Sequence, residues 1–265
     1  MGPQAIRSAL GLLALTAGLV GSGRIVSRHY LFPTEEVPAV RAPDDVVRRD
    51  CRASDGVRVH ALEIPAPAGG RTIVYFHNNR ETVEERVGFA RRLRARGFGV
   101  LLVEYRGYGS AREASPSEDG LYADAEAALD ALDQRGTGPE RVVLWGTSLG
   151  TGVAAEMARR GRGARLVLVS PYTSIPGLVT AVARLVPAGL LVADHFDTLS
   201  KAAGILIPTL VIHGDSDEIV PYWMGERLTD AIAHARLVTV AGGHHGDLFE
   251  REGERLLSEV AALGG

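Results

Sequence analysis

Short apolar runs alternate with longer amphipathic segments along most of this 265-residue chain. The run at 57–64 alternates apolar and polar side chains, which is typical of a strand with one solvated face. The later runs are short and almost wholly apolar, which indicates strands buried on both faces. Between them, apolar positions recur every three or four residues and predict helices. The predicted strands are 57–64, 72–76, 100–104, 142–145, 166–169, 209–213 and 237–240, and the predicted helices are 81–96, 118–134, 149–160, 222–233 and 245–263.

This alternation predicts an α/β fold with a mostly parallel sheet and helices on both of its faces. In such a sheet, the loops that follow the strands meet at one edge, where ligands usually bind. We therefore expect chemistry at that edge. The loops expected to meet there are 76–80, 105–110, 146–150, 171–175, 214–220 and 243–247.

One stretch does not follow the alternation of short strands and single helices. Residues 172–207 are long for a single connection between two strands and include the apolar segments 177–187 and 188–192. We expect a small helical cap over the loop edge, and not a separate domain. Exposed apolar residues there would suit an acyl chain or a membrane surface. Ordinary packing of a crossover helix fits the same pattern.

The N-terminal stretch 8–23 carries no charge and is flanked by Arg7 and Arg24. As a helix it would span about 24 Å, slightly less than the roughly 30 Å of a bilayer core. We interpret it as a membrane anchor, with the side of the membrane left open. A cleaved signal peptide, which would leave a secreted or periplasmic protein, and a helix packed on the domain are the alternatives.

The expected domain organisation follows from these segments. A hydrophobic N-terminal segment is expected at 1–28 and a proline-punctuated linker at 29–45. The α/β domain is expected at 46–265, with the cap as an insertion. A domain of this size can bury a sizeable core.

Charge and cysteine content limit which binding partners and which cysteine chemistry are expected. The 29 basic residues are scattered and the formal net charge is −3, so we expect no nucleic-acid partner. The densest basic run, 91–96, lies on a predicted helix with an apolar opposite stripe, and we interpret it as a solvated face. The single cysteine, Cys51, allows no intrachain disulfide and has no evident catalytic partner. The oligomeric state stays open.

The pentapeptide Gly146-Thr147-Ser148-Leu149-Gly150 follows an apolar run and opens an alanine-rich helical pattern. This is G-x-S-x-G at a strand-to-helix junction, which is typical of the nucleophile elbow of an α/β-hydrolase. The two glycines, Gly146 and Gly150, allow the close packing that so tight a turn needs. Ser148 is therefore the candidate nucleophile. The alternative is that it is only a small residue in a βα turn.

A serine hydroxyl needs a base to take its proton, usually a histidine that a carboxylate orients. In this fold the acid and then the histidine follow the serine along the chain. The loop after the predicted strand 209–213 offers Asp215, Asp217 and Glu218 as acids. The loop after the next strand offers His244 and His245. Each alone could be a turn residue, but their order after Ser148 favours nucleophilic catalysis.

The oxyanion formed by attack on a carbonyl needs preorganised N–H donors. One is expected from Leu149, which directly follows the candidate nucleophile at a helix N-terminus. The other is expected from the loop after the strand 72–76, with the N–H of Asn79 as first choice and that of Asn78 as second. We expect His77 to brace this loop and not to act as a base. Such chemistry needs no metal and no organic cofactor.

Together these motifs resemble those of the α/β-hydrolase-domain serine hydrolases, a group that includes mammalian lysophosphatidylserine lipases and protein depalmitoylases. Related chains are often described as serine aminopeptidases or prolyl-oligopeptidase-like. The resemblance covers about 45–263 and implies an α/β-hydrolase fold and a hydrolase activity, without specifying the substrate. An N-terminal hydrophobic segment is common in such relatives and favours the anchor. The matching stretches are 75–79, 105–110, 116–124, 145–150, 170–174, 213–221 and 242–247.

The resemblance also selects among the candidates. The pattern H-G-x-x-D-x-x-V-P places the acid on Asp217. The pattern G-x-x-H-N-D places the base on His245, so that His244 takes a variable place. The chain departs from the family pattern at Asn78, where glycine is usual, at Glu104, where aspartate is frequent, and at Gly246, where asparagine is usual. None of these departures removes a catalytic group.

Three functions fit these observations. The first is a serine hydrolase of carboxylic esters or thioesters, including lipid-like acyl substrates, in which Ser148 attacks, His245 takes the proton and Asp217 orients the imidazole. The second is a serine peptidase that acts on short peptides. The third is a membrane-tethered binding protein of the same fold without turnover.

Overall fold

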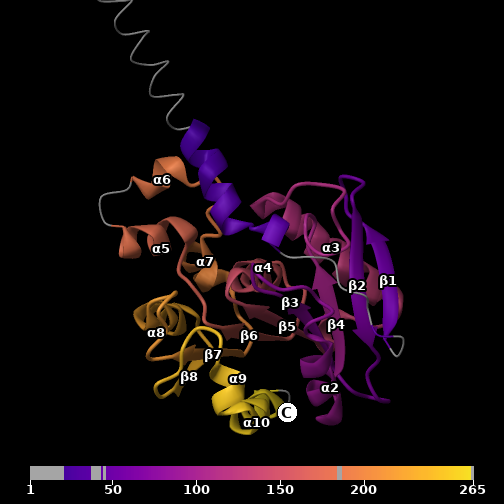
Figure 1. The fold of residues 1–265 in the computed structure, drawn as a ribbon. Coiled ribbons are helices and arrows are strands. Elements are labelled where there is room, and N and C mark those ends of the chain that lie inside the picture. Colours follow the sequence, from indigo (N-terminus) through magenta and orange to yellow (C-terminus); the bar gives the residue numbers. More distant parts are fainter. Residues whose placement is uncertain (1–20, 37–42, 44–45, 184–186, 264–265) are drawn as a thin grey trace, which may run out of the picture.

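The computed structural model describes residues 21–36, 43, 46–183 and 187–263. Within them the chain forms a sheet of eight strands in the order β1-β2-β4-β3-β5-β6-β7-β8 (Figure 1). The strands are β1 Val47–Arg52, β2 Arg58–Ile64, β3 Thr72–Phe76, β4 Gly99–Glu104, β5 Val142–Thr147, β6 Arg165–Val169, β7 Thr209–Gly214 and β8 Ala235–Val240.

The strand pairing is parallel from β4 to β8, through β3, β5, β6 and β7. Only β1 and β2 pair antiparallel, β1 with β2 and β2 with β4. The predicted α/β fold with a mostly parallel sheet is therefore confirmed. Strand β1 was not predicted, because its sequence Val-Arg-Arg-Asp-Cys-Arg carries too few apolar side chains to give a strand pattern.

Side chains of the central strands alternate between two apolar layers. Val74 and Phe76 face one layer with Leu144, whereas Tyr75 and Trp145 face the other. The first layer is closed by α3 Glu118–Gln134, α4 Leu149–Arg159 and α8 Tyr222–Ala231. The second layer is closed by α2 Val87–Ala95, α9 Leu248–Arg251 and α10 Gly253–Leu263, which lie together below the sheet in Figure 1.

Two helices differ from their predicted bounds by more than two residues. The helix predicted at 81–96 begins only at Val87, because the Glu81 carboxylate is engaged by the N–H of Asn78 and by Arg86, and the segment before α2 forms turns. The helix predicted at 245–263 is divided into α9 and α10, with the break at Glu252.

Between β6 and β7 the chain forms short helices at the same end of the molecule as the N-terminal helix over residues 21–31 (Figure 1). Phe32, within the stretch predicted to be a linker, is buried and packs against Phe196 with ring centroids 6.4 Å apart. The described N-terminal helix is thus attached to the domain at its end, through Phe32. The short helices are α5 Ile175–Val182, α6 Ala188–Leu191, α7 Thr198–Lys201 and the 3₁₀ turn η3 Ala202–Gly204, and a further 3₁₀ turn, η1 Thr34–Glu36, follows the N-terminal helix.

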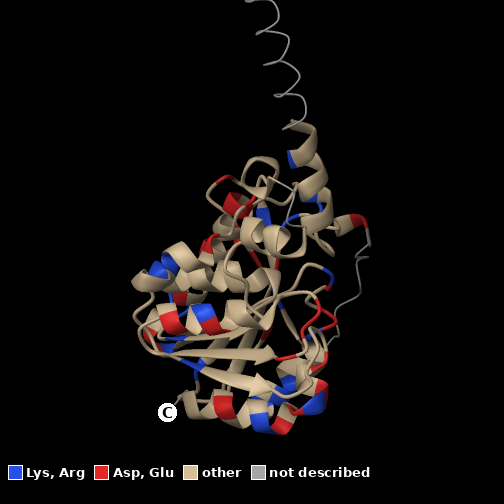
Figure 2. Cartoon of the chain, turned by 90° about the vertical axis from the view of Figure 1, so that its left-hand side faces the viewer, with Lys and Arg blue, Asp and Glu red and all other residues tan. Residues whose placement is uncertain are grey.

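The predicted hydrophobic segment 8–23 lies almost wholly outside the described residues. Among the helices that the structure describes, none combines the length and apolar character needed to cross a bilayer. Lys and Arg residues are interspersed with Asp and Glu over the helices in the view of Figure 2.

Candidate active site

Ser148 stands at the junction of β5 and α4 with φ 51° and ψ −116°. A positive φ is uncommon for a residue with a side chain and marks a backbone held by its surroundings. One interaction that keeps the backbone in this conformation is the hydrogen bond from the N–H of Ser148 to Val169 O, at 2.9 Å. The close packing of the elbow glycines also restricts the backbone, since a Cβ at Gly146 would collide with Gly150 and a Cβ at Gly150 would collide with Phe76 O. The side chain is consequently presented, partly exposed, at the loop edge of the sheet.

The structure brings the three predicted side chains of Ser148, His245 and Asp217 together. His245 Nε2 lies 2.9 Å from Ser148 Oγ. His245 Nδ1 lies 2.9 Å from Asp217 Oδ2 and 3.1 Å from Oδ1. A proton on Nδ1 then leaves Nε2 as the acceptor for the serine hydroxyl. This is the arrangement that can activate a serine.

Asp217 is fixed on all sides. Its Oδ1 accepts the N–H groups of Ile219, at 2.9 Å, and Val220, at 2.8 Å. Its side chain is fully buried, which alone would raise its pKa, but His213 and His245 on its oxygens hold the pKa well below its usual range. The group therefore stays a carboxylate and can stabilise a positive imidazole.

His213 is a neighbour of the site to which the sequence gave no role. It is buried at the end of β7, with Nε2 3.0 Å from Val220 O and 3.3 Å from Asp217 Oδ2. The Nε2–H donates to the carbonyl and faces the carboxylate, so His213 helps to keep Asp217 in place. The sequence feature that could have indicated this role is that His213 begins the pattern His213-Gly-x-x-Asp217.

The alternative acids and the alternative base lie apart from Ser148. Asp215 accepts the N–H of Gly242 at 2.7 Å and so ties the acid loop to the histidine loop. Glu218 lies 3.1 Å from His244 Nδ1, and both side chains are exposed. His244 thus pairs with a surface carboxylate, while His245 takes the inward position.

In the loop after β3, the backbone N–H groups of the two asparagines differ in their hydrogen bonding. The N–H of Asn78 donates to Glu81 Oε1 at 3.1 Å, so it is already engaged. Among the described residues, the N–H of Asn79 donates to no protein acceptor, and its side chain donates to Leu31 O at 3.0 Å. Leu149 is the first residue of α4, so its N–H lacks an acceptor within the helix. Asn79 and Leu149 are thus the available donors.

His77 lies beneath this loop, as the bracing interpretation expects. Its Nδ1 is 2.6 Å from Asn78 O, so Nδ1–H donates to that carbonyl. Its Nε2 lies 3.1 Å from Glu104 Oε1, and both side chains have no exposed surface. The sequence gave Glu104 no role; nothing in its local pattern indicates that β4 places it against His77.

Within the described part of the chain, no three His, Cys, Asp or Glu side chains are arranged to hold a metal ion.

Known proteins with similar sequences place this site in a family. The chain is 36% identical to the uncharacterized protein Rv2307c of Mycobacterium tuberculosis, over 97% of each chain. It is 32% identical to alpha/beta hydrolase domain-containing protein 17B of Xenopus laevis, over 79% of this chain and 73% of the frog protein. The chain belongs to the α/β-hydrolase family. This α/β-hydrolase also matches the family models described as "Serine aminopeptidase, S33" at 70–199 and as "TAP-like protein" at 192–256.

Solved structures agree on the fold. The esterase Pf2001 of Pyrococcus furiosus superposes with a TM-score of 0.69 at 16% identity, over 86% of this chain and 97% of the esterase. The esterase RhEst1 of Rhodococcus sp. ECU1013 gives a TM-score of 0.65 at 19% identity, over 81% and 97%. At such low identities the likeness extends to the fold alone.

Proposed function

We propose that this α/β-hydrolase cleaves carboxylic esters or thioesters through an acyl-enzyme on Ser148. The observation that carries the proposal is the continuous hydrogen-bonded arrangement from Ser148 Oγ through His245 to a buried, ionised Asp217. Two solved structures of the same fold are esterases, so an ester is the first substrate class to test.

The reaction follows from these contacts. Ser148 Oγ attacks the acyl carbon while His245 Nε2 takes the hydroxyl proton. The negative charge on the carbonyl oxygen is received by the N–H groups of Leu149 and Asn79. The C–O or C–S bond then breaks and His245 returns the proton to the leaving alcohol or thiol. Water, deprotonated by His245, releases the carboxylic acid and regenerates Ser148.

Labelling by a fluorophosphonate probe tests the nucleophile, with hydrolysis of p-nitrophenyl acetate as the activity readout. We expect the wild-type protein to be labelled, and Ser148→Ala to lose both labelling and at least about a thousandfold of kcat. Ser258→Ala is the matched control, because Ser258 lies exposed on α10. Equal labelling of wild type and Ser148→Ala would refute Ser148 as nucleophile, and an unlabelled, folded wild type would favour a binding protein without turnover.

The family model described as a serine aminopeptidase supports a second candidate, a peptidase for short peptides. The same site would attack an amide, and the amine would leave in place of the alcohol. Aminoacyl p-nitroanilides beside the p-nitrophenyl ester separate the two. We expect the ester to be cleaved with the higher kcat/KM, and a preference for the anilides would overturn the esterase proposal.

A further inference from the structure

A cavity of about 270 Å³ lies beside His245, between α2, α9 and the ends of β3, β5 and β6. Its lining includes four aromatic residues, of which Phe89 and Phe249 are partly exposed and Tyr75 and Trp145 are buried. Neighbouring rings meet edge to face, with centroids 5.0 Å apart for Phe89 and Phe249 and 5.6 Å for Phe89 and Trp145. Such packing makes the wall firm and apolar.

Some polar groups of this wall are turned toward one another, and Asn78, Arg92 and Glu250 also belong to the lining. Trp145 Nε1–H donates to Thr147 Oγ1 at 3.2 Å, and the Tyr75 hydroxyl lies 3.2 Å from the same oxygen. Burial raises the pKa of Tyr75, so its hydroxyl stays neutral. Arg86 is paired with Glu81. The cavity therefore offers the rings of Phe89 and Phe249 to a guest, which suits an uncharged group.

The cavity lies on the histidine side of the nucleophile. Its lining includes His245 and Gly246 from the base loop and Asn78 from the loop after β3. Of the described residues, neither Ser148 nor any in 172–207 lines it. In the proposed reaction the acyl group is bound to Ser148, while the leaving group departs toward the imidazole that protonates it. A guest here would consequently be the leaving group.

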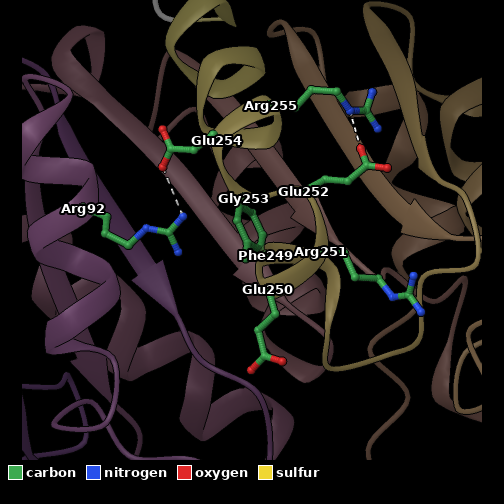
Figure 3. Close-up of a pocket in the computed structure, with 8 residues that line it drawn as sticks. All are labelled: Arg92, Phe249, Glu250, Arg251, Glu252, Gly253, Glu254 and Arg255. Atoms are coloured by element: carbon green, nitrogen blue, oxygen red, sulfur yellow. Dashed lines mark hydrogen bonds and ion pairs between the residues drawn. The ribbon is translucent and has the colours of Figure 1, made fainter.

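A groove leads from the cavity to the surface. It lies between α2 and the segment from α9 into α10, and it shares Arg92, Phe249 and Glu250 with the cavity. Figure 3 shows this groove, in which charged side chains surround Phe249 and Arg92 is paired with Glu254. A released alcohol or thiol could leave by this route without crossing the helices at 172–207.

Gly246 lines the cavity at the histidine loop and is itself exposed. A Cβ added to this residue would meet no atom within 4 Å. It is also the position at which the chain departs from the pattern G-x-x-H-N-D, where asparagine is usual. A larger side chain at 246 can therefore be introduced beside the cavity without a collision at its Cβ.

We propose that this cavity, defined by Tyr75, Phe89, Trp145, Phe249 and Gly246, binds the leaving alcohol or thiol of the substrate. At about 30 Å³ for each water-sized group, it accommodates an uncharged aromatic or branched group of about nine non-hydrogen atoms. The inference rests on the proposed esterase function and adds the class of leaving group.

Two alkyl acetates test the inference, because their alcohols have similar acidity and differ mainly in size. We expect kcat/KM for 2-phenylethyl acetate to exceed that for ethyl acetate by at least about tenfold. Gly246→Leu should reduce this ratio by about tenfold, the effect of one or two methylene groups in an apolar pocket. Gly88→Leu is the control, because Gly88 is exposed on α2 with open space before its Cβ, and it should keep the wild-type ratio.

Phe89→Ala gives an independent second variant, which should raise the relative kcat/KM for the bulkier 2-(1-naphthyl)ethyl acetate. Unchanged alcohol ratios in both Gly246→Leu and Phe89→Ala, in protein that still reacts with the fluorophosphonate, would overturn the leaving-group assignment alone. A change confined to the acyl series from ethyl acetate to ethyl hexanoate would overturn it as well. Failure of the wild type to react with the fluorophosphonate would instead reject the proposed function.

Discussion

The two sides of the site around Ser148 are built in different ways. The histidine loop and the acid loop are held by contacts within 213–247, such as Asp217 with Val220 and Asp215 with Gly242. The loop after β3 is held from far along the chain, by Leu31 on Asn79 and by Glu104 through His77. The base side is thus assembled from two adjacent strand ends. The oxyanion side depends on the rest of the fold.

This difference determines how a substitution on each side should affect activity and stability. His245 and Asp217 take part in proton transfer, so their loss should act on chemistry directly. Glu104 and Leu31 touch no substrate in the proposed reaction, and their loss should act through the position of Asn79 or through stability. The predictions that follow separate these two kinds of effect.

The largest effect is expected on the base side. His245→Ala removes the group that takes the Ser148 proton, and we expect kcat for p-nitrophenyl acetate to fall at least about a thousandfold. His244→Ala is the matched control from the neighbouring position, where the side chain pairs with exposed Glu218. It should keep kcat within about threefold. Loss of activity in His244→Ala alone would reverse the assignment of the base.

An intermediate effect, on stability, is expected at Glu104. Glu104→Leu removes the buried carboxylate 3.1 Å from His77 Nε2 and leaves that nitrogen only its 3.5 Å contact with the N–H of Tyr105. Breaking a buried pair costs about 3 kcal/mol. Glu104→Gln keeps an oxygen acceptor at nearly the same place, so a smaller loss is expected. Urea unfolding followed by circular dichroism measures both. Equal losses for the two variants would show that the polar contact with His77 contributes little.

The same contrast decides what could be predicted from the sequence. Ser148, the acid loop and the histidine loop each follow an apolar strand, so the order of strands predicted that these segments would meet. The resemblance to the family then selected Asp217 and His245, and the structure places both in contact with each other and His245 in contact with Ser148. Glu104 was seen only as a departure from a pattern, because its contact with His77 requires the pairing of β3 with β4. Local periodicity contains no such information.

The N-terminal segment gives a second example. Its prolines and polar residues predicted a linker over 29–45, yet Phe32 is buried and the carbonyl of Leu31 receives a hydrogen bond from Asn79. The contact joins residues 48 positions apart and uses a backbone oxygen. Because every residue has such an oxygen, no side-chain pattern could have indicated it.

The smallest effect is expected at Asn79, whose side chain holds the loop while its N–H is the proposed oxyanion donor. Asn79→Ala keeps the N–H and removes one hydrogen bond to Leu31 O, a contribution of about 1 kcal/mol. If that bond positions the donor, kcat for p-nitrophenyl acetate should fall about fivefold while KM stays within twofold, because the donor acts mainly in the transition state. Ser27→Ala is the control, since Ser27 on the same N-terminal helix contacts Ala193 and not this loop. A raised KM with unchanged kcat in Asn79→Ala would instead place the contact in substrate binding, and the N-terminal segment would then have no part in positioning the oxyanion donor.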